Sequence, residues 1–176
     1  MGIDKAFVKY GNRNLYEYSL SVLSFFSGDI LISSSNPVLD NLNYRRIEDE
    51  MPNLGPLGGI YSCLKNIRLS SAIVLPCDLP LITIDIIQTL LKNSQGYEIT
   101  VALNHQGQPE PLIGIYSAAV LLVMEKMIQS KQYKMQEILK VAKTNFVKIP
   151  GLPPATFMNV NNPDELLSLP PIIPGK

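Results

Sequence analysis

The stretch SAIVLPCDLP (residues 71–80) decides the fold, because it places an acidic side chain just after a short apolar strand. The continuous apolar run in SAIVL is typical of a strand buried on both faces of a parallel sheet. Pro76 ends this strand, so we expect Asp78 to be held rigidly at the edge of the sheet. Ligands of open α/β sheets bind outside the carboxyl ends of the strands, which makes this stretch a candidate functional site.

Outward from this strand, apolar residues alternate between the spacing of strands and the spacing of helices. The alternation predicts an α/β fold with a mainly parallel sheet and helices on both faces. Residues 1–169 are expected to form one domain, followed by a loose, proline-rich tail at residues 170–176. Strands are expected at residues 29–34, 44–47, 71–75, 97–103, 111–116 and 146–149, and helices at residues 15–26, 55–67, 83–92 (with Thr83 as N-cap), 118–128, 133–142 and 164–169.

The composition argues against several classes of protein. Hydrophobic residues make up 46% of the 176 residues, which argues against a disordered chain. The 15 basic and 15 acidic side chains give a formal net charge of zero, which argues against general nucleic-acid binding. No membrane span or signal peptide is visible, so we expect a cytoplasmic protein. Cys63 and Cys77 lie in apolar segments and are interpreted as reduced core thiols.

Polar residues follow three of the expected strands. Asn36 ends the motif SSSN, Asp49 lies within IEDE, and Asp78 follows SAIVL. Because the carboxyl ends of parallel strands meet at one edge of a sheet, these three loops are expected to cluster. Simpler alternatives remain at two of them, since Asn36 precedes a proline as turn residues often do, and a short acidic cluster such as IEDE is usually solvated.

Asp78 and Lys5 are the residues best suited to phosphate chemistry. A carboxylate at a sheet edge suits Mg²⁺, which takes one or two protein carboxylates together with substrate phosphates. The alternative is that Asp78 only shapes the turn between Pro76 and Pro80. Lys5 could supply compact positive charge to phosphate oxygens, although a lone lysine is ordinarily a solvated surface charge.

Two further motifs could bind a nucleotide or a metal. GPLGGI begins at Gly55 and opens a helix, where backbone N–H groups can meet an anion or a base edge. A tight turn from strand to helix is the alternative. FMNVNNPDEL places Asn159 and Asn161 before a helix opened by Pro163, where their oxygens could complete a Mg²⁺ shell or cap the helix. No Ser-His-Asp set and no zinc motif occurs in the sequence.

Taken in order, the motifs resemble the molybdenum cofactor guanylyltransferase family, which implies a Rossmann-like nucleotidyltransferase fold. The resemblance runs from Met1 to about Leu169, and the order of the motifs makes it specific. The stretches that carry it are MGIDKAFVKYGN, ILISSSN, EDEMPNLGPLGGI, VLPCDLP, EPLIGIYS and FMNVNNPDEL.

The resemblance also implies roles for individual residues. Lys5 and Asp78 resemble catalytic residues, Asp78 resembles the family's Mg²⁺ ligand, and Asn159 resembles a weaker candidate on the metal side. The residues that resemble nucleotide-binding positions are Lys5, Asn36, Asp49, Gly55 and Asp78.

The family's reaction joins GMP from GTP to molybdopterin and releases pyrophosphate, with Mg²⁺ as the implied cofactor. A phosphate nucleophile is already anionic, so the absence of a catalytic triad agrees with this reaction. The implied partners are GTP, molybdopterin, molybdenum-insertion proteins and molybdoenzymes, with no nucleic acid and no membrane. Two alternatives stay open: a cytidylyl- or other nucleotidyltransferase of the same fold, and an inactive truncated protein that binds a nucleotide or cofactor.

The sequence departs from the family at its start. The family opens with a buried strand and a loop of the form LAGGxSxRMGxDK, whereas this sequence begins at the Met of that pattern. We therefore expect the first strand of the fold to be missing and the chain to be truncated at its N-terminus. The loop's N–H groups would have been the better discriminator between GTP and CTP.

Overall fold

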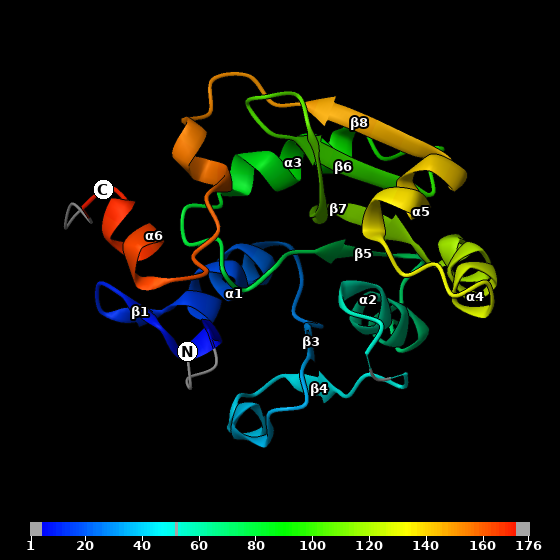
Figure 1. Ribbon diagram of the computed structural model, residues 1–176, viewed down its shortest axis with the longest axis horizontal. Helices are drawn as coiled ribbons and strands as arrows, with labels where there is room; N and C mark the ends of the chain where they lie inside the picture. Colours follow the sequence, from blue (N-terminus) through cyan, green and yellow to red (C-terminus); the bar gives the residue numbers. More distant parts are fainter. Residues whose placement is uncertain (1–4, 52, 172–176) are drawn as a thin grey trace.

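The computed structural model describes residues 5–51 and 53–171, and its main sheet has four strands in the order β5-β7-β6-β8 (Figure 1). These strands are β5 (Ser71–Val74), β6 (Ile99–Leu103), β7 (Pro109–Ser117) and β8 (Thr144–Lys148). β7 runs antiparallel to β5 and to β6, and β6 runs parallel to β8. Three strands therefore share a direction, and β7 is reversed because a short turn joins it to β6 as a hairpin.

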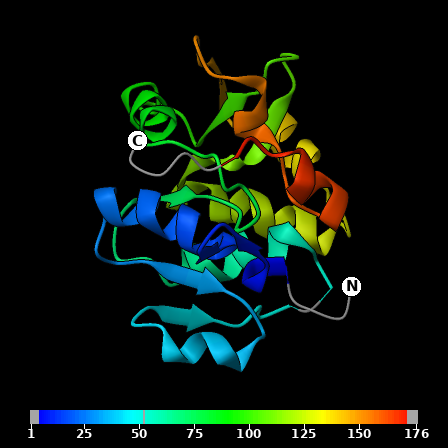
Figure 2. The same cartoon turned by 90° about the vertical axis from the view of Figure 1, so that its left-hand side faces the viewer.

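Two smaller pairs of strands complete the sheet structure. β3 (Leu31–Ser33) pairs in parallel with β4 (Arg45–Ile47), and Figure 2 shows this pair at one end of the molecule, apart from the main sheet. β1 (Lys9–Tyr10) and β2 (Arg13–Asn14) form an antiparallel pair that the sequence pattern does not predict. Each of these two strands is only two residues long, too short to show a period.

Helices cover one face of the main sheet and bury most of the core there. They are α2 (Pro56–Lys65), α4 (Leu121–Gln129) and α5 (Met135–Val141). The buried residues of this face include Leu57, Leu64, Ile99, Val101, Tyr116, Met124, Met127 and Ile138.

The other face is covered by α3 (Ile84–Lys92) and by Val22 of α1 (Leu15–Phe26). Successive side chains of β7 point to opposite faces of the sheet. Tyr116 therefore packs in the core of the first face, while Ile113 and Ile115 pack in the core of the second. The prediction of an α/β fold with helices on both faces is thus confirmed. The remaining elements are α6 (Pro163–Ser168) and the 3₁₀ helices η1 (Lys5–Phe7), η2 (Pro37–Asn41), η3 (Ala118–Val120) and η4 (Pro154–Phe157).

Three expectations about buried groups need correction. β5 is only half-buried rather than buried on both faces, because one of its edges borders a cavity. Cys63 and Cys77 form no disulfide with each other, but Cys63 is half-buried and Cys77 is exposed, so neither is the core residue that was expected. Thr83 does stand at the N-cap of α3, yet its hydroxyl makes no capping hydrogen bond.

The two ends of the chain are described only in part. The opening stretch is described from Lys5 onward, so the expected truncation falls outside the described residues, as does most of the expected tail. Leu169 is buried, and the predicted end of the domain at this residue stays a prediction. Within residues 5–51 and 53–171, no helix has the length and apolar character needed to cross a lipid bilayer.

Replacing Met124 by alanine is expected to destabilise the protein by about 2–5 kcal/mol, because it removes a fully buried side chain and leaves a cavity. Met124 lies on α4 with 0% of its surface exposed, whereas Leu122 on the same helix is 68% exposed. Leu122→Ala is the matched control and should change the free energy of unfolding by about 0.5 kcal/mol or less. Urea unfolding followed by circular dichroism measures both, and equal effects would contradict this description of the core.

Candidate functional site

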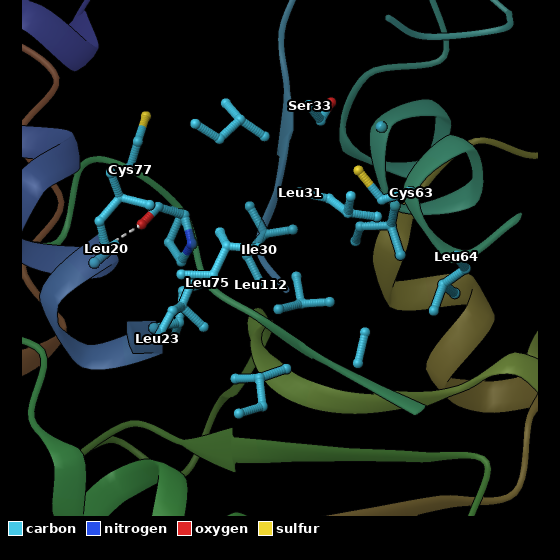
Figure 3. Close-up of a pocket in the computed structure, with 18 of the residues that line it drawn as sticks. Leu20, Leu23, Ile30, Leu31, Ser33, Cys63, Leu64, Leu75, Cys77 and Leu112 are labelled. Carbon is cyan, nitrogen blue, oxygen red and sulfur yellow. Dashed lines mark hydrogen bonds between the residues drawn. The ribbon is translucent and has the colours of Figure 1, made fainter. Parts of the chain in front are cut away.

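A cavity of about 770 Å³ separates the β3–β4 pair from the main sheet. Residues of β3, β5, α1 and α2 line it, and its wall is mostly apolar. Figure 3 shows leucine and isoleucine side chains facing this space from several elements. The labelled apolar residues are Leu20, Leu23, Ile30, Leu31, Leu64, Leu75 and Leu112.

Four of the predicted site residues line this one cavity: Asp49, Gly55, Asp78 and Asn159. They come from loops that follow β4, precede α2, follow β5 and precede α6. Of the three loops expected to cluster, those of Asp49 and Asp78 line the cavity, while the SSSN motif reaches it through Ser33 and Ser34. Asn36 is outside the cavity wall.

Asn36 occupies the N-cap position of η2. Its side-chain Oδ1 accepts a hydrogen bond from the Val38 backbone N–H at 3.1 Å, and its own N–H donates to Ser34 Oγ at 3.0 Å. This is the turn-forming arrangement that the Asn-Pro sequence predicts. The nucleotide role suggested for Asn36 stays a prediction.

Asp78 lines the cavity with a partly buried carboxyl group. Its backbone C=O accepts a hydrogen bond from the Val160 N–H at 2.9 Å, which joins the loop after β5 to the segment before α6. Its side-chain Oδ1 is buried and has no hydrogen-bond partner among the described residues. Burial raises the pKa of this carboxyl, a hydrogen bond from its own backbone N–H and the charge of Lys5 oppose the rise, and the charge of Glu165 adds to it. A buried, unpaired carboxylate oxygen is costly unless a ligand or proton satisfies it.

Lys5 contacts the segment before α6, the same segment that is joined to the Asp78 loop. Its Nζ donates a hydrogen bond to Asn161 Oδ1 at 2.8 Å, across 156 residues of sequence. The Asn161 N–H in turn donates to Glu165 Oε2 at 2.5 Å. Asn162 caps α6 by accepting from the Glu165 N–H at 2.9 Å, so the capping role falls to Asn162 and leaves the Asn161 side chain to Lys5.

Asp49 forms a second polar group at the other side of the cavity. Ser33 Oγ, at the end of β3, donates a hydrogen bond to Asp49 Oδ1 at 3.0 Å. Gly59 of α2 lies against this pair, since a Cβ added there would be 2.3 Å from Ser33 Oγ and 3.4 Å from Asp49 Oδ1. Glycine is therefore required for α2 to approach Ser33 so closely.

Gly55 gives α2 its starting geometry. It stands at the N-cap with φ 60° and ψ −147°, a conformation that L side chains rarely adopt. Pro56 follows at the first helical position, where its missing N–H costs nothing. The glycine-rich motif thus acts as a tight turn that points the start of α2 at the cavity.

Ser33 and Glu165 are site residues that the sequence-based candidates do not include, and Asn161, considered there for a metal shell or a cap, instead contacts Lys5. Glu165 stands three residues after the N-cap Asn162, a spacing that predicts a carboxylate folded back on the start of a helix. Ser33 belongs to the SSSN motif, but only the close approach of α2 shows which serine meets Asp49. Hydrogen bonds between distant segments leave no periodic signal in a sequence, so the partners of Lys5 and Asp49 were not predictable.

Curated proteins similar to this chain share one description. A protein of Flavobacterium johnsoniae described as "Probable molybdenum cofactor guanylyltransferase" is 29% identical over 170 residues, which cover 96% of this chain and 89% of that protein. A protein of Carboxydothermus hydrogenoformans with the same description is 32% identical over 170 residues, covering 94% of this chain and 86% of that protein.

Solved structures show the same fold. The molybdopterin-guanine dinucleotide biosynthesis protein A of Archaeoglobus fulgidus superposes with a TM-score of 0.78 at 20% identity, covering 94% of this chain and 88% of that one. The 2-C-methyl-D-erythritol 4-phosphate cytidylyltransferase of Thermus thermophilus gives a TM-score of 0.70 at 14% identity, covering 93% and 90%. The Rossmann-like nucleotidyltransferase fold is therefore confirmed.

The family model described as the MobA-like NTP transferase domain matches residues 1–146 of the 176. This match includes the loops that carry Lys5, Asp49, Gly55 and Asp78, while Asn159 lies beyond it. The chain belongs to the MobA-like NTP transferase family.

Proposed function

We propose that this chain transfers GMP from GTP to molybdopterin and releases pyrophosphate. Membership of the NTP transferase family and the shared description of its relatives support this reaction. The observation that carries the proposal is the buried, unpartnered Oδ1 of Asp78, which lies within electrostatic range of the Lys5 ammonium. A carboxylate with one unsatisfied oxygen that feels the charge of a lysine is suited to a ligand that brings both metal and phosphate.

The residues present fit a Mg²⁺ ion. The described residues hold no cluster of three or more His, Cys, Asp or Glu side chains that could bind a metal by themselves. Mg²⁺ is commonly bound by one or two carboxylates, with waters and substrate phosphates completing its shell. Asp78 would hold the ion with help from Asn159, which lines the same cavity. When bound, Mg²⁺ would neutralise charge on the phosphate oxygens of the nucleotide.

Lys5 is assigned to the phosphates of the nucleotide. Its hydrogen bond to Asn161 limits the positions of a long, exposed side chain and so lowers the entropy lost when phosphate binds. The attacking phosphate is already anionic, so positioning and charge stabilisation are the contributions required of the protein. No histidine base or protein nucleophile is needed for this step.

Asp49 is assigned to the base of the nucleotide. Its Oδ1 already accepts from Ser33, while a carboxylate can accept several hydrogen bonds at once. Guanine presents adjacent N–H donors on its pairing edge, whereas cytosine presents one amino group there. An acidic acceptor therefore favours GTP over CTP, and Gly55 and Asn36 stand on the loops nearest to it in sequence.

Asp78→Asn is expected to remove the Mg²⁺ dependence of GTP binding. Isothermal titration with Mg²⁺ and with EDTA should show that the unchanged chain binds GTP at least about tenfold more tightly with the metal, because Asp78 would hold the ion and the ion would offset the charge of the phosphates. The variant should bind equally in both conditions and release about 10²-fold less pyrophosphate when molybdopterin is added. Asp85→Asn, an exposed carboxylate on α3, is the control. A variant that keeps the metal dependence would remove Asp78 from the metal site.

Lys5 and Asn161 are expected to act as one unit. Lys5→Gln and Asn161→Ala should each weaken GTP binding, and the double variant should lose no more than Lys5→Gln alone, because the amide acts through the lysine. The exposed Lys9→Gln provides a matched control with no expected effect. Additive losses in this double-mutant cycle would show that Asn161 acts independently of Lys5.

Asp49→Asn is expected to reduce the preference for GTP over CTP. The asparagine side chain has an NH₂ donor in place of one carboxylate oxygen, and this donor cannot accept a hydrogen bond from the N–H groups of guanine. Competition of the two nucleotides for one fluorescent GTP analogue measures the preference, and Glu50→Gln in the same acidic motif serves as control. An unchanged ratio in the Asp49 variant would place base selection elsewhere, and tighter CTP binding by the unchanged chain would favour cytidylyl transfer.

A further inference from the structure

The loops that carry Ser33 and Asp49 are joined by one guanidinium group, that of Arg46 in β4. Its Nη1 donates hydrogen bonds to the Ser34 backbone C=O at 3.0 Å and to Glu48 Oε1 at 2.7 Å. Ser34 directly follows Ser33, and Glu48 directly precedes Asp49. One side chain therefore contacts the chain neighbours of both residues in the hydrogen bond from Ser33 to Asp49.

An ion pair with η2 fixes the direction of this guanidinium. Arg46 Nε donates to Asp40 Oδ1 at 2.5 Å, and Arg46 Nη2 donates to Asp40 Oδ2 at 3.1 Å. The hydrogen bond from Arg46 lowers the pKa of the Asp40 carboxyl, so the pair stays charged near neutral pH. Only 14% of the Arg46 side chain is exposed. A planar guanidinium can donate in three directions at once, whereas the lysine ammonium is a point charge on a flexible stem.

The segment that follows Asp49 is anchored separately. The Glu50 N–H donates a hydrogen bond to Ser62 Oγ at 2.9 Å, and Ser62 is fully buried on α2. This anchor does not involve Arg46. Loss of the Arg46 contacts would therefore loosen the junction of the two loops without releasing the far side of the acidic motif.

We propose that Arg46 is a positioning residue that holds Ser33 and Asp49 in the geometry that receives the base of the nucleotide. Arg46 is outside the cavity wall, so it acts on a ligand through these two loops. Fixing an acceptor before binding lowers the entropy lost when the base binds. The inference rests on the proposed role of Asp49 toward the base, and its test therefore needs a measurement that requires no nucleotide.

Arg45, the preceding residue of β4, provides the matched control. Successive side chains of a strand point to opposite faces, and Arg45 has different partners. Its Nη2 donates to Asp29 Oδ1 at 3.1 Å and to the Asn66 C=O at 3.2 Å. Both partners lie outside the SSSN and IEDE motifs. Arg45→Lys and Arg46→Lys each keep the positive charge and lose the planar guanidinium, so they differ only in which contacts they break.

Cys63 of α2 reports the position of Asp49 without a nucleotide, and it faces the cavity in Figure 3. Burial raises the pKa of its thiol to about 11, the charge of Asp49 adds to the rise, and the charge of Arg45 opposes it. Movement of Asp49 away from α2 would therefore lower this pKa. The pH dependence of Cys63 alkylation measures it in a Cys77→Ser background, where Cys63 is the only cysteine of the chain.

We expect Arg46→Lys to lower the pKa of Cys63 by about half a unit, which makes alkylation at pH 8 about threefold faster. Asp49→Asn should shift this pKa in the same direction, because it removes the negative charge. Arg45→Lys should leave it unchanged, since the charge near the thiol is kept. Thermal unfolding checks that each variant folds. Asp40→Asn, which weakens the same ion pair from its exposed side, should give a smaller shift and serves if Arg46→Lys does not fold.

Competition between GTP and CTP then tests the link to the base. Arg46→Lys should reduce the preference for GTP about as much as Asp49→Asn, and the double variant should lose no more than Asp49→Asn alone. Additive losses would overturn the proposal. An unchanged pKa of Cys63 in Arg46→Lys would also overturn it, as would an equal shift in Arg45→Lys, which would indicate a general loosening of β4. A lowered pKa in a chain without any preference for GTP would support the positioning role and contradict the proposed function.

Discussion

The pairing of β5 with β7 is the constraint on which the candidate site depends. It runs from Ser71 opposite Ser117 to Val74 opposite Gly114, and Gly114 lets β7 lie close to β6, since a Cβ there would be 2.8 Å from Thr100 O. This pairing fixes one edge of β5 against the main sheet. β5 ends at Val74, and Asp78 follows four residues later, where its backbone C=O accepts a hydrogen bond from the Val160 N–H.

Charge is divided between two sides of one cavity. Asp78 and Lys5 lie where the chain's two terminal segments meet, and the hydrogen bond from Lys5 to Asn161 joins those segments directly. Asp49 lies on the other side, held by Ser33 and approached by Gly59. The separation suits a nucleotide, whose phosphates and base need opposite kinds of partner: cations for the phosphates, and hydrogen-bond acceptors for the N–H groups of the base.

An apolar wall lies between these two polar regions. It consists of strand and helix residues whose periodicity predicts burial, yet the apolar residues of β5 stay half-exposed toward the cavity.

How far the sequence predicts this protein can be followed in particular residues. Apolar spacing is a local property, so it correctly gave the helix from Leu15 to Phe26 and the strand that begins at Ser71, and it missed the two-residue strands β1 and β2. Motif order gave the family, which the match to residues 1–146 confirms.

The sequence by itself therefore determined the α/β class, the types and order of most elements, and the placement of Asp78 after a strand. Only the tertiary structure decided that β7 is reversed within the sheet, that Lys5 meets Asn161, and that Ser33 rather than its neighbours binds Asp49. The physical reason is that periodicity and turn chemistry act over a few residues, whereas these contacts depend on how distant segments pack. Packing also created the cavity, since no single segment contains the space that its neighbours leave between them.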